Sequence, residues 1–209
     1  MQKGISKSTL SRLPVYLQYL KSLPKSSTDN ISSTMLAGTF CLGEVQVRKD
    51  LASVSNAGKP KIGYNVSSLI LELENFLGYN NVNDAVIIGA GRLGKALLGF
   101  NGFRQYGLNI VAAFDVDENK LGKTPEGKSI ITVSEFSNIC SRLKIHIGII
   151  TVPTESAQAV CNQMIENGIL AIWNFAPTHL DVPPNILVHN ENMAASLALL
   201  SNHLKEKIK

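Results

Sequence analysis

The stretch AVIIGAGRLGKALLGF occupies residues 85–100 and decides the fold of the C-terminal part of the chain. A short apolar run rich in β-branched residues leads into GxGxxG, and a helix-like segment follows, which is the context that a dinucleotide-binding loop requires. In such a loop Gly89 permits the tight turn, Gly91 lets the backbone approach a pyrophosphate, and Gly94 lets helix and strand pack closely. The pattern predicts a pyrophosphate at the helix N-terminus, although a glycine turn in any α/β protein gives the same letters.

Apolar segments with strand character continue downstream of this loop and alternate with helical ones. Strands alternating with helices are typical of βαβ units and a parallel sheet, so the fold class predicted for this part is α/β. The predicted strands are residues 85–88, 109–117, 145–153, 169–175 and 186–190, and the clearest intervening helix is 155–168.

Asp115 ends the second strand, 21 residues after Gly94. A carboxylate at that place can accept hydrogen bonds from the adenosine ribose and would repel a 2′-phosphate, which favours NAD(H) over NADP(H) as the cofactor. The alternative is an aspartate that only starts a turn. Lys120 could flank the adenine or be solvated.

The same region lacks the parts of an enzyme. Residues 84–190 suffice for one dinucleotide fold, and no second, substrate-binding domain fits. The four histidines match no metal-ligand spacing. No acid or base can be nominated beside a nicotinamide, as hydride transfer would need. The nucleotide is therefore predicted to be a ligand that is read, with no catalytic residues and no metal.

Composition and charge narrow the classes further. The chain has 209 residues, 44% hydrophobic and 17% charged, which excludes a disordered chain. Three cysteines cannot pair evenly, and no apolar run approaches the roughly 18–20 residues that span a bilayer, so the cytoplasm is the expected location. Residues 1–80 hold nine basic and five acidic residues, whereas 81–209 hold eleven of each. Such asymmetry hints at nucleic acid or a membrane surface.

The N-terminal 80 residues have the pattern of a DNA-binding domain. Apolar spacing predicts a helix over 8–23, with Leu10 and Val15 on its apolar face, a short second helix with Ser33 as N-cap, and a third helix over 43–54. Two short helices joined by a tight glycine-containing turn describe a helix-turn-helix. A β-wing over 56–65 and a helix over 66–78 complete the predicted domain.

Several motifs together resemble the redox-sensing transcriptional repressor family Rex over nearly the whole chain. They are RLPVYLQYL (12–20), ISS (31–33), QVRKDL (46–51), GYNV (63–66), GAGRLG (89–94), AAFDVD (112–117), TVP (151–153) and NFAP (174–177). The resemblance implies a winged-helix N-terminal domain, a Rossmann NAD(H)-binding domain and a C-terminal helix swapped between the subunits of a homodimer. It also implies that NADH releases the protein from operator DNA.

The resemblance divides the chain and assigns its site residues. It implies a winged-helix DNA-binding domain over 1–80, a Rossmann domain over 81–190 and a dimerisation helix over 191–209. The expected DNA-binding residues are Ser33, Gln46, Arg48, Lys49, Lys59 and Lys61. The expected NAD(H)-binding residues are Gly89, Ala90, Gly91, Arg92, Leu93, Gly94, Asp115, Val116, Lys120, Thr151, Val152, Pro153, Asn174, Phe175, Ala176 and Pro177.

Two departures from the family pattern stand out. ASVSNAG (52–58) replaces an aromatic, glycine-rich segment after RKDL, so a different operator or weaker DNA binding is expected. Gln18, Phe100 and Asn192 stand where the family carries Arg, Tyr and Asp in a polar network that links redox state to domain closure. These side chains cannot form that network, because the charges and the hydroxyl are gone. The hypothesis is a divergent paralogue with weakened discrimination between NADH and NAD+.

Two other readings remain open. One is a non-regulatory NAD- or CoA-binding module, since TVP and NFAP also resemble segments of CoA-binding domains in ligase subunits. The other is a small NAD-dependent oxidoreductase, which lacks both space and an acid/base. Asp115 favours NAD(H) over CoA, because a nearby acid would repel the 3′-phosphate of CoA.

Overall fold

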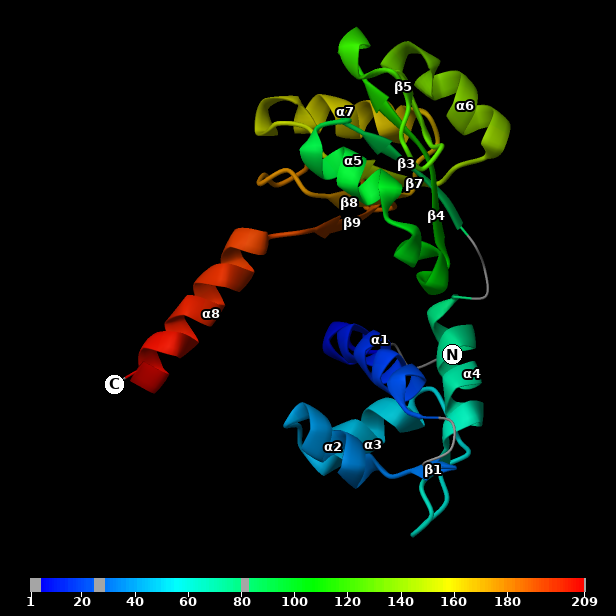
Figure 1. Ribbon diagram of the computed structural model, residues 1–209, viewed down its shortest axis with the longest axis vertical. Helices are drawn as coiled ribbons and strands as arrows, with labels where there is room; N and C mark the ends of the chain where they lie inside the picture. The colour runs from blue at the N-terminus through cyan, green and yellow to red at the C-terminus, as the bar shows by residue number, and fades with distance from the viewer. Residues whose placement is uncertain (1–4, 25–28, 80–82, 209) are drawn as a thin grey trace. The chain divides into compact units, whose positions relative to one another are not determined.

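The computed structural model describes residues 5–24, 29–79 and 83–208. The chain divides into two compact units, Met1–Asn81 and Val82–Lys209 (Figure 1). Each unit has its own hydrophobic core. Within the described ranges, no helix has the length and apolar character that crossing a membrane would require.

The N-terminal unit is a winged helix. Helices α2 and α3 pack against each other as the predicted helix-turn-helix, and the wing, residues 58–63, leads into an antiparallel pair of strands (Figure 1). The elements described in this unit are α1 (Lys7–Ser22), β1 (Asn30–Ile31), α2 (Ser33–Phe40), α3 (Glu44–Ala52), β2 (Tyr64–Asn65) and α4 (Val66–Leu77).

Three details of the prediction for this unit are wrong. The N-cap of α2 is Ser32 and not Ser33, because the Ser32 hydroxyl accepts the Met35 N–H at 3.1 Å while Ser33 is already helical. Adjacent serines are equivalent caps in sequence, and only the backbone conformation separates them. Leu10 and Val15 were placed on the buried face of the first helix, yet they are 42% and 46% exposed. At 100° per residue, Leu10 lies at the edge of the stripe formed by the buried residues Leu13, Tyr16, Leu17 and Leu20, whereas Val15 projects to the opposite side of the helix.

The core of the N-terminal unit forms where α1 meets the other helices. Tyr16 and Leu17 of α1 pack with Leu51 of α3 and Leu69 of α4, and each is at most 2% exposed. Such side chains each contribute about 1.5–3 kcal/mol when taken out of water. The helix-turn-helix is therefore held against α1 and α4 mainly by apolar burial.

One buried ion also joins α1 to α3. The Asp50 side chain is 1% exposed, and its carboxylate accepts hydrogen bonds from Arg12, whose Nε lies 2.6 Å away, and from the Tyr16 hydroxyl at 3.0 Å. Thr9 Oγ1 donates at 3.1 Å and Gln46 Nε2 at 2.9 Å. A buried carboxylate needs this many donors to offset its loss of hydration.

These contacts set the protonation of the cluster. Burial by itself would raise the pKa of Asp50, but the hydrogen bonds from Arg12, Gln46, Tyr16 and Thr9 outweigh it and lower the pKa below the ordinary value of 3.8. Burial and the Asp50 hydrogen bond raise the pKa of Tyr16 to about 12. At neutral pH the cluster is therefore a carboxylate, a guanidinium and a neutral phenol.

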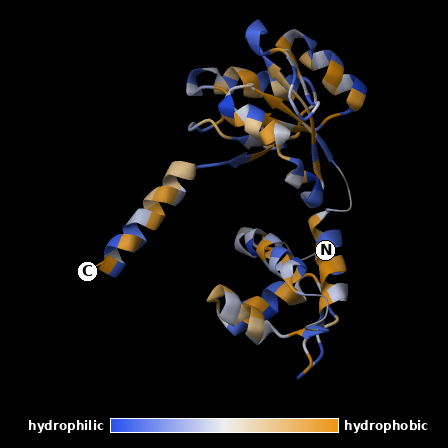
Figure 2. Ribbon diagram, in the orientation of Figure 1, coloured by the Kyte–Doolittle hydropathy of each residue, from blue (hydrophilic) through white to orange (hydrophobic). Residues whose placement is uncertain are grey.

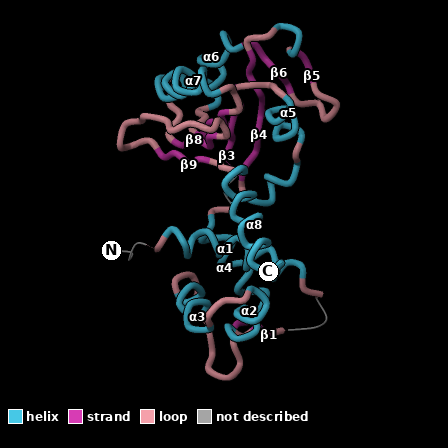
Figure 3. The backbone as a smooth tube through the Cα atoms, turned by 90° about the vertical axis from the view of Figure 1, so that its left-hand side faces the viewer, coloured by secondary structure: helices cyan, strands magenta, loops and turns pink. Residues whose placement is uncertain are grey.

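The C-terminal unit is a Rossmann-like sheet with helices on both faces. Its seven described strands run in the order β5-β6-β4-β3-β7-β8-β9, all parallel except β5. Figure 3 shows β8 and β9 on one side of β3 and β4, and β6 and β5 on the other. The strands are β3 (Asn83–Ile88), β4 (Leu108–Asp115), β5 (Gly122–Lys123), β6 (Ser129–Thr132), β7 (Ile147–Ile150), β8 (Ala171–Asn174) and β9 (Leu187–Asn190). The helices are α5 (Arg92–Gly99), η1 (Asn101–Tyr106), η2 (Glu118–Lys120), η3 (Val133–Glu135), α6 (Phe136–Leu143), α7 (Thr154–Glu166) and α8 (Met193–Ile208).

The side chains of the central strand β3 are buried on both faces of the sheet. Val86 and Ile88 pack into the core under α6 and α7, whereas Ala85 and Ile87 pack into the core under α5. Alternate side chains thus enter opposite cores, as expected for a parallel sheet covered by crossover helices. Five of these strands match the predicted ones. Strands β5 and β6 were not predicted, because they have only two and four residues. Helix α6 was not predicted either.

Helix α8 exposes apolar side chains along its length. Met193, Leu197, Leu200 and Leu204 are each more than half exposed, and Figure 2 shows apolar and polar residues alternating along the helix. An exposed row of apolar residues at helical spacing is typical of a helix that packs against another chain.

Asp50→Asn tests the buried cluster. We expect the variant to lower the free energy of unfolding of the N-terminal unit by about 3 kcal/mol at pH 7, because Arg12 loses its counter-ion. The folded-state pKa of Asp50 lies below its ordinary value of 3.8, so the stabilisation is complete above about pH 5 and is lost as the pH falls through the folded-state pKa. The gap between wild type and variant should therefore shrink below pH 4.

The measurement is urea unfolding followed by circular dichroism at several pH values. Asp29→Asn, at an exposed position of the same unit, is the control and should change stability by no more than about 0.5 kcal/mol. A pH-independent gap would contradict the role given to the carboxylate charge.

Candidate functional site

A cavity of about 680 Å³ lies at the carboxyl ends of β3, β4, β7 and β8. This edge of a doubly wound sheet is where ligands bind, at the point where the strand order reverses. Here the reversal falls between β3 and β7. The cavity is lined by Ile88, Gly89, Gly91, Leu93, Asp115, Val116, Lys120, Val133, Thr151, Val152, Pro153, Ser156, Val160, Gln163 and Phe175.

The absence of a side chain has a different physical reason at each of the three glycines of the loop. Gly89 has a φ of +105°, and a Cβ there would lie 2.7 Å from the Thr151 carbonyl oxygen. A Cβ on Gly94 would overlap the Gly89 carbonyl oxygen. Thr151 locks this close approach, since its hydroxyl donates to the Gly89 carbonyl at 2.6 Å. Gly89 and Gly94 are therefore required by the protein's own packing.

Gly91 is different, because no contact with the described part of the chain requires a glycine at this position. Its φ of −69° is open to any residue, and a Cβ would meet no described atom within 4 Å. It is the N-cap of α5 and lines the cavity. Free N–H groups at a helix N-terminus attract an anion, and a bare backbone lets that anion come close.

Asp115 lines the cavity but is already hydrogen bonded within the chain. Its carboxylate accepts the N–H of Ala90 at 2.7 Å and that of Asp117 at 2.9 Å. Lys120 Nζ lies 3.2 Å from both carboxylate oxygens. Burial would raise the pKa of Asp115, but these donors lower it below its ordinary value. Lys120, left by the sequence as either adenine-flanking or solvated, is thus an ion-pair partner of Asp115.

Ten of the sixteen residues expected to bind NAD(H) line the cavity. Asn174 is fully buried and holds the turn after β8, donating to the carbonyls of Ala176 and Thr178. The Ala90 N–H donates a hydrogen bond to the Asp115 carboxylate. Gly94 allows the close approach of the Gly89 carbonyl oxygen. The remaining three are off the lining, with Arg92 and Pro177 exposed and Ala176 buried.

Sequence reasoning missed five lining residues. Ser156, Val160 and Gln163 recur at i, i+4 and i+7 on α7, so the helical period carried a signal once the helix was known to cover the cavity. Ile88 ends the strand before the glycine loop, and Val133 follows β6, a strand that was not predicted.

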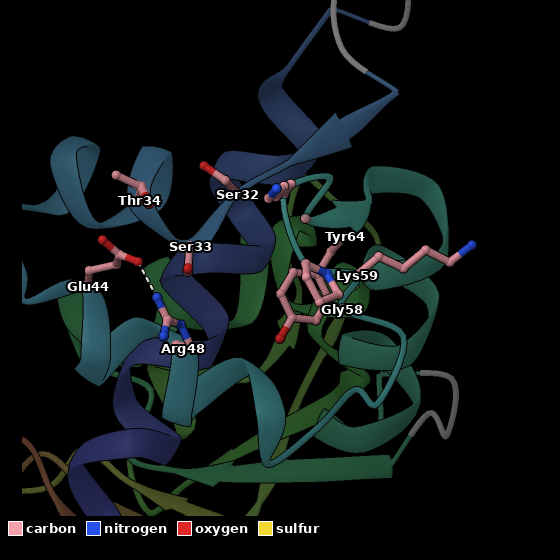
Figure 4. Close-up of a pocket in the computed structure, with 11 residues that line it drawn as sticks. Ser32, Ser33, Thr34, Glu44, Arg48, Gly58, Lys59 and Tyr64 are labelled. Carbon is pink, nitrogen blue, oxygen red and sulfur yellow. Dashed lines mark hydrogen bonds and ion pairs between the residues drawn. The ribbon is translucent and has the colours of Figure 1, made fainter.

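A second concave surface lies in the winged-helix unit. A groove of about 590 Å³ runs between the start of α2, α3 and the wing (Figure 4). Four expected DNA-binding residues line it: Ser33, Arg48, Lys59 and Lys61. Its other lining residues are Ser32, Thr34, Glu44, Gly58, Pro60, Gly63 and Tyr64. Lys49 is exposed on α3 outside the lining, and Gln46 donates to Asp50.

The wing is a tight hairpin with one strained residue. Lys59 and Gly63 exchange two backbone hydrogen bonds of 2.9 Å, and Gly63 has a φ of +87°. Lys61 at the tip has a φ of +65°, a left-handed conformation that costs a non-glycine residue about 1 kcal/mol. Lys61 is exposed and lines the groove, so its charge is presented at this concave surface.

Two of the three residues that depart from the family pattern, Phe100 and Asn192, make local contacts. Phe100 is 56% exposed and stacks edge-on against Phe103, with ring centroids 4.9 Å apart. The Asn192 side chain accepts the Ala195 N–H at 2.8 Å near the start of α8. Gln18 is exposed on α1.

The fold and the two sites define the class of protein: a winged-helix unit joined to a Rossmann-like unit, whose cavity is lined by a glycine, Gly91, that no internal contact requires. The chain belongs to the Rex family of redox-sensing transcriptional repressors. Over 200 residues it is 40% identical to the Rex protein of Bacteroides fragilis, covering 96% of this chain and 91% of that protein. It is 39% identical to the Rex protein of Treponema denticola, covering 99% and 98%.

Solved structures and family models agree with this assignment. A crystal structure of RSP in complex with β-NAD+ and operator DNA superposes with a TM-score of 0.90 at 33% identity, over 98% of this chain and 94% of that one. RSP with β-NADH gives a TM-score of 0.89 at 32% identity, over 98% and 96%. The family "Putative DNA-binding protein N-terminus" matches residues 4–52, and "CoA binding domain" matches 80–178.

Gly91→Ala tests the cavity as a dinucleotide site. We expect the affinity for NADH to fall at least tenfold, because the new methyl group stands where the backbone must approach the pyrophosphate. The melting temperature should change little, since that methyl group meets no described atom within 4 Å. The measurements are calorimetric titration with NADH and thermal unfolding.

Gly38→Ala is the matched control, because a Cβ at this glycine of α2 also meets nothing within 4 Å. It should leave NADH affinity unchanged. Equal NADH affinity in wild type and Gly91→Ala would contradict the assignment.

Lys61→Gly tests the wing. Glycine relieves the left-handed strain but gains freedom in the unfolded chain, so we expect a stability gain of at most about 1 kcal/mol. DNA affinity should nevertheless fall severalfold, and the slope of its dependence on salt should drop by about 1, as for one lost phosphate contact.

The measurements are thermal unfolding and DNA binding across a salt series. Lys144→Gly is the control, since Lys144 has a φ of +51° at the end of α6 in the other unit. It should gain similar stability with no effect on DNA. Unchanged salt dependence in Lys61→Gly would exclude the phosphate contact.

Proposed function

We propose that this chain is a DNA-binding transcriptional repressor that senses the NADH/NAD+ ratio and acts as a homodimer in the cytoplasm. The winged-helix unit binds operator DNA, and the cavity binds NAD(H) as a ligand that is read, with no catalytic step. The support is the family membership together with the similar structures that hold NAD+ and operator DNA, or NADH.

The observation that carries the nucleotide part is the open space beside Gly91. Internal packing explains two glycines of the loop, and a ligand backbone at the N-terminus of α5 explains the third. The residues present therefore fit a dinucleotide. Gly91 and the first turn of α5 would hold the pyrophosphate, and Asp115 with Lys120 would face the adenosine ribose.

The DNA part rests on the groove and on the exposed face of α3. Arg48, Lys59 and Lys61 bring three cations to one concave surface, and Lys49 adds a fourth on α3. The start of α2 presents backbone N–H groups to the same groove, which suits a phosphate. In a helix-turn-helix the second helix enters the major groove, so α3 is the proposed recognition helix.

The dimer rests on α8. Its exposed apolar row would be buried against a second copy of the chain, as the resemblance to swapped family helices implies. Two recognition helices related by a two-fold axis would then require an operator with two inverted half-sites.

The nucleotide preference is set by two opposing features. Val152, Pro153 and Phe175 form an apolar wall at the ends of β7 and β8, which favours the uncharged reduced nicotinamide over the cationic oxidised ring. The charges of the family's linking network are missing at Gln18 and Asn192. We therefore keep the proposal of a divergent paralogue whose preference for NADH is weakened.

A non-regulatory CoA-binding module is the second candidate, because the family model that matches residues 80–178 is described by that ligand. Asp115 and Asp117 place two acids near the ribose end against one lysine, which disfavours the extra 3′-phosphate of CoA. CoA serves as a competitor in the experiment that follows.

The experiment is a gel-shift assay on the DNA upstream of the protein's own gene. We expect salt-sensitive, sequence-selective binding, and the protected sequence should contain inverted half-sites. A scrambled duplex of the same length is the control. Binding that does not distinguish the two duplexes would count against the repressor.

The same assay is then titrated with NADH, NAD+ and CoA. NADH is expected to release the DNA at a lower concentration than NAD+, and CoA to have no effect. A several-hundred-fold preference for NADH would refute the weakened discrimination, and release by CoA alone would favour the second candidate.

A further inference from the structure

Glu44 occupies an unexpected place for a protein that binds a polyanion. Among the described residues lining the groove it is the only acid, and it is the first residue of α3 (Figure 4). Its Oε1 accepts a hydrogen bond from Nη2 of Arg48, one turn further along the same helix. An acid and its partner cation thus share the surface that the proposed function assigns to DNA.

Stability alone does not account for this pair. Both side chains are solvated, at 42% exposure for Glu44 and 62% for Arg48, and exposed ion pairs within a helix add little to stability. The charge of Glu44 suits the helix N-terminus, but at an exposed position this interaction adds only a little to stability. The acid is therefore expected to repel phosphates in return for only a small gain in stability.

The geometry of the pair suits base reading. N-terminal residues of a recognition helix contact base edges in the major groove. An arginine donates two hydrogen bonds to the O6 and N7 of guanine, and a glutamate accepts from the N4 amino group of cytosine. One carboxylate oxygen of Glu44 holds Arg48, which leaves the other free to accept from a base.

We propose that Glu44 is a specificity-determining residue, which orients Arg48 toward a guanine and accepts a hydrogen bond from a cytosine amino group in the operator. This inference rests on the proposed DNA-binding function. The wing lysines contact phosphates, which bind any sequence, and the Glu44–Arg48 pair rejects sequences that lack the G·C pair at its position. The acid thereby lowers affinity for all DNA and raises the ratio of specific to non-specific affinity.

The test is selection of duplexes from a random-sequence library with the full-length chain. Wild type is expected to enrich a G·C pair at a fixed position in each half-site. Glu44→Gln, a shape-conserving change, should lose the preference at that position only. It should also bind a scrambled duplex as well as wild type or severalfold better, so the ratio of selected to scrambled affinity falls at least tenfold.

Two further variants complete the test: one changes the arginine of the pair, and the other is a control outside the groove. Arg48→Lys retains the charge but cannot donate the bidentate pair of hydrogen bonds to guanine. It should therefore lose the same base preference while keeping its affinity for scrambled DNA. Glu74→Gln is the control, because Glu74 also pairs with a cation, Lys21 at 2.6 Å, but lies outside the groove. It removes the same charge and should leave the ratio unchanged.

The results distinguish a failure of the role proposed for Glu44 from a failure of the proposed DNA-binding function. Enrichment by wild type together with an unchanged base profile in Glu44→Gln would overturn the role of Glu44 and leave the repressor standing. A wild-type chain that enriches no sequence would overturn the proposed function, and the inference with it.

Discussion

A buried carboxylate must find donors for its oxygens, and this constraint organises both units of the chain. Asp50 is 1% exposed and joins α3 to α1 through Thr9, Arg12 and Tyr16, while Gln46 of α3 itself supplies a further donor. Asp115 is 7% exposed and ties the end of β4 to the glycine loop through the Ala90 N–H. Removing either set of donors would leave an unpaired buried charge, which is among the costliest defects in a folded protein.

The Asp50 cluster also determines which residues of α3 are exposed, because of the helical spacing. Gln46 and Asp50 lie one turn apart, and the Gln46 amide donates to the Asp50 carboxylate although Gln46 is itself exposed. Arg48 and Lys49 lie between them in sequence and are both exposed. Fixing Asp50 inward against α1 thus sets which residues of α3 face solvent. This explains why one motif, QVRKDL, contributes to both the core and the groove.

The cavity of the other unit follows from close approach of backbone to backbone. Strand β3, the turn at Gly89 and the start of α5 fit together only without side chains at Gly89 and Gly94, and Thr151 locks the turn from the neighbouring strand. The same packing leaves Gly91 beside open space at the helix N-terminus. A scaffold rigid at two glycines and open at the third is suited to a ligand that binds through its phosphates, as a sensor of nucleotide requires.

The sequence by itself determined the fold class, the family and most lining residues, because these depend on local periodicity and on glycine spacing at a strand–helix turn. It could not determine which partner each polar side chain takes once the chain has folded. The pairing of Asp50 with Arg12 and Gln46, the pairing of Asp115 with Lys120, and the burial of Asn174 were decided by tertiary structure. So were the choice of Ser32 over Ser33 as cap and the exposure of Leu10 and Val15. In each case the physical reason is the same: a polar group bonds to the partner that folding brings near, and an apolar side chain is buried only where another element covers it.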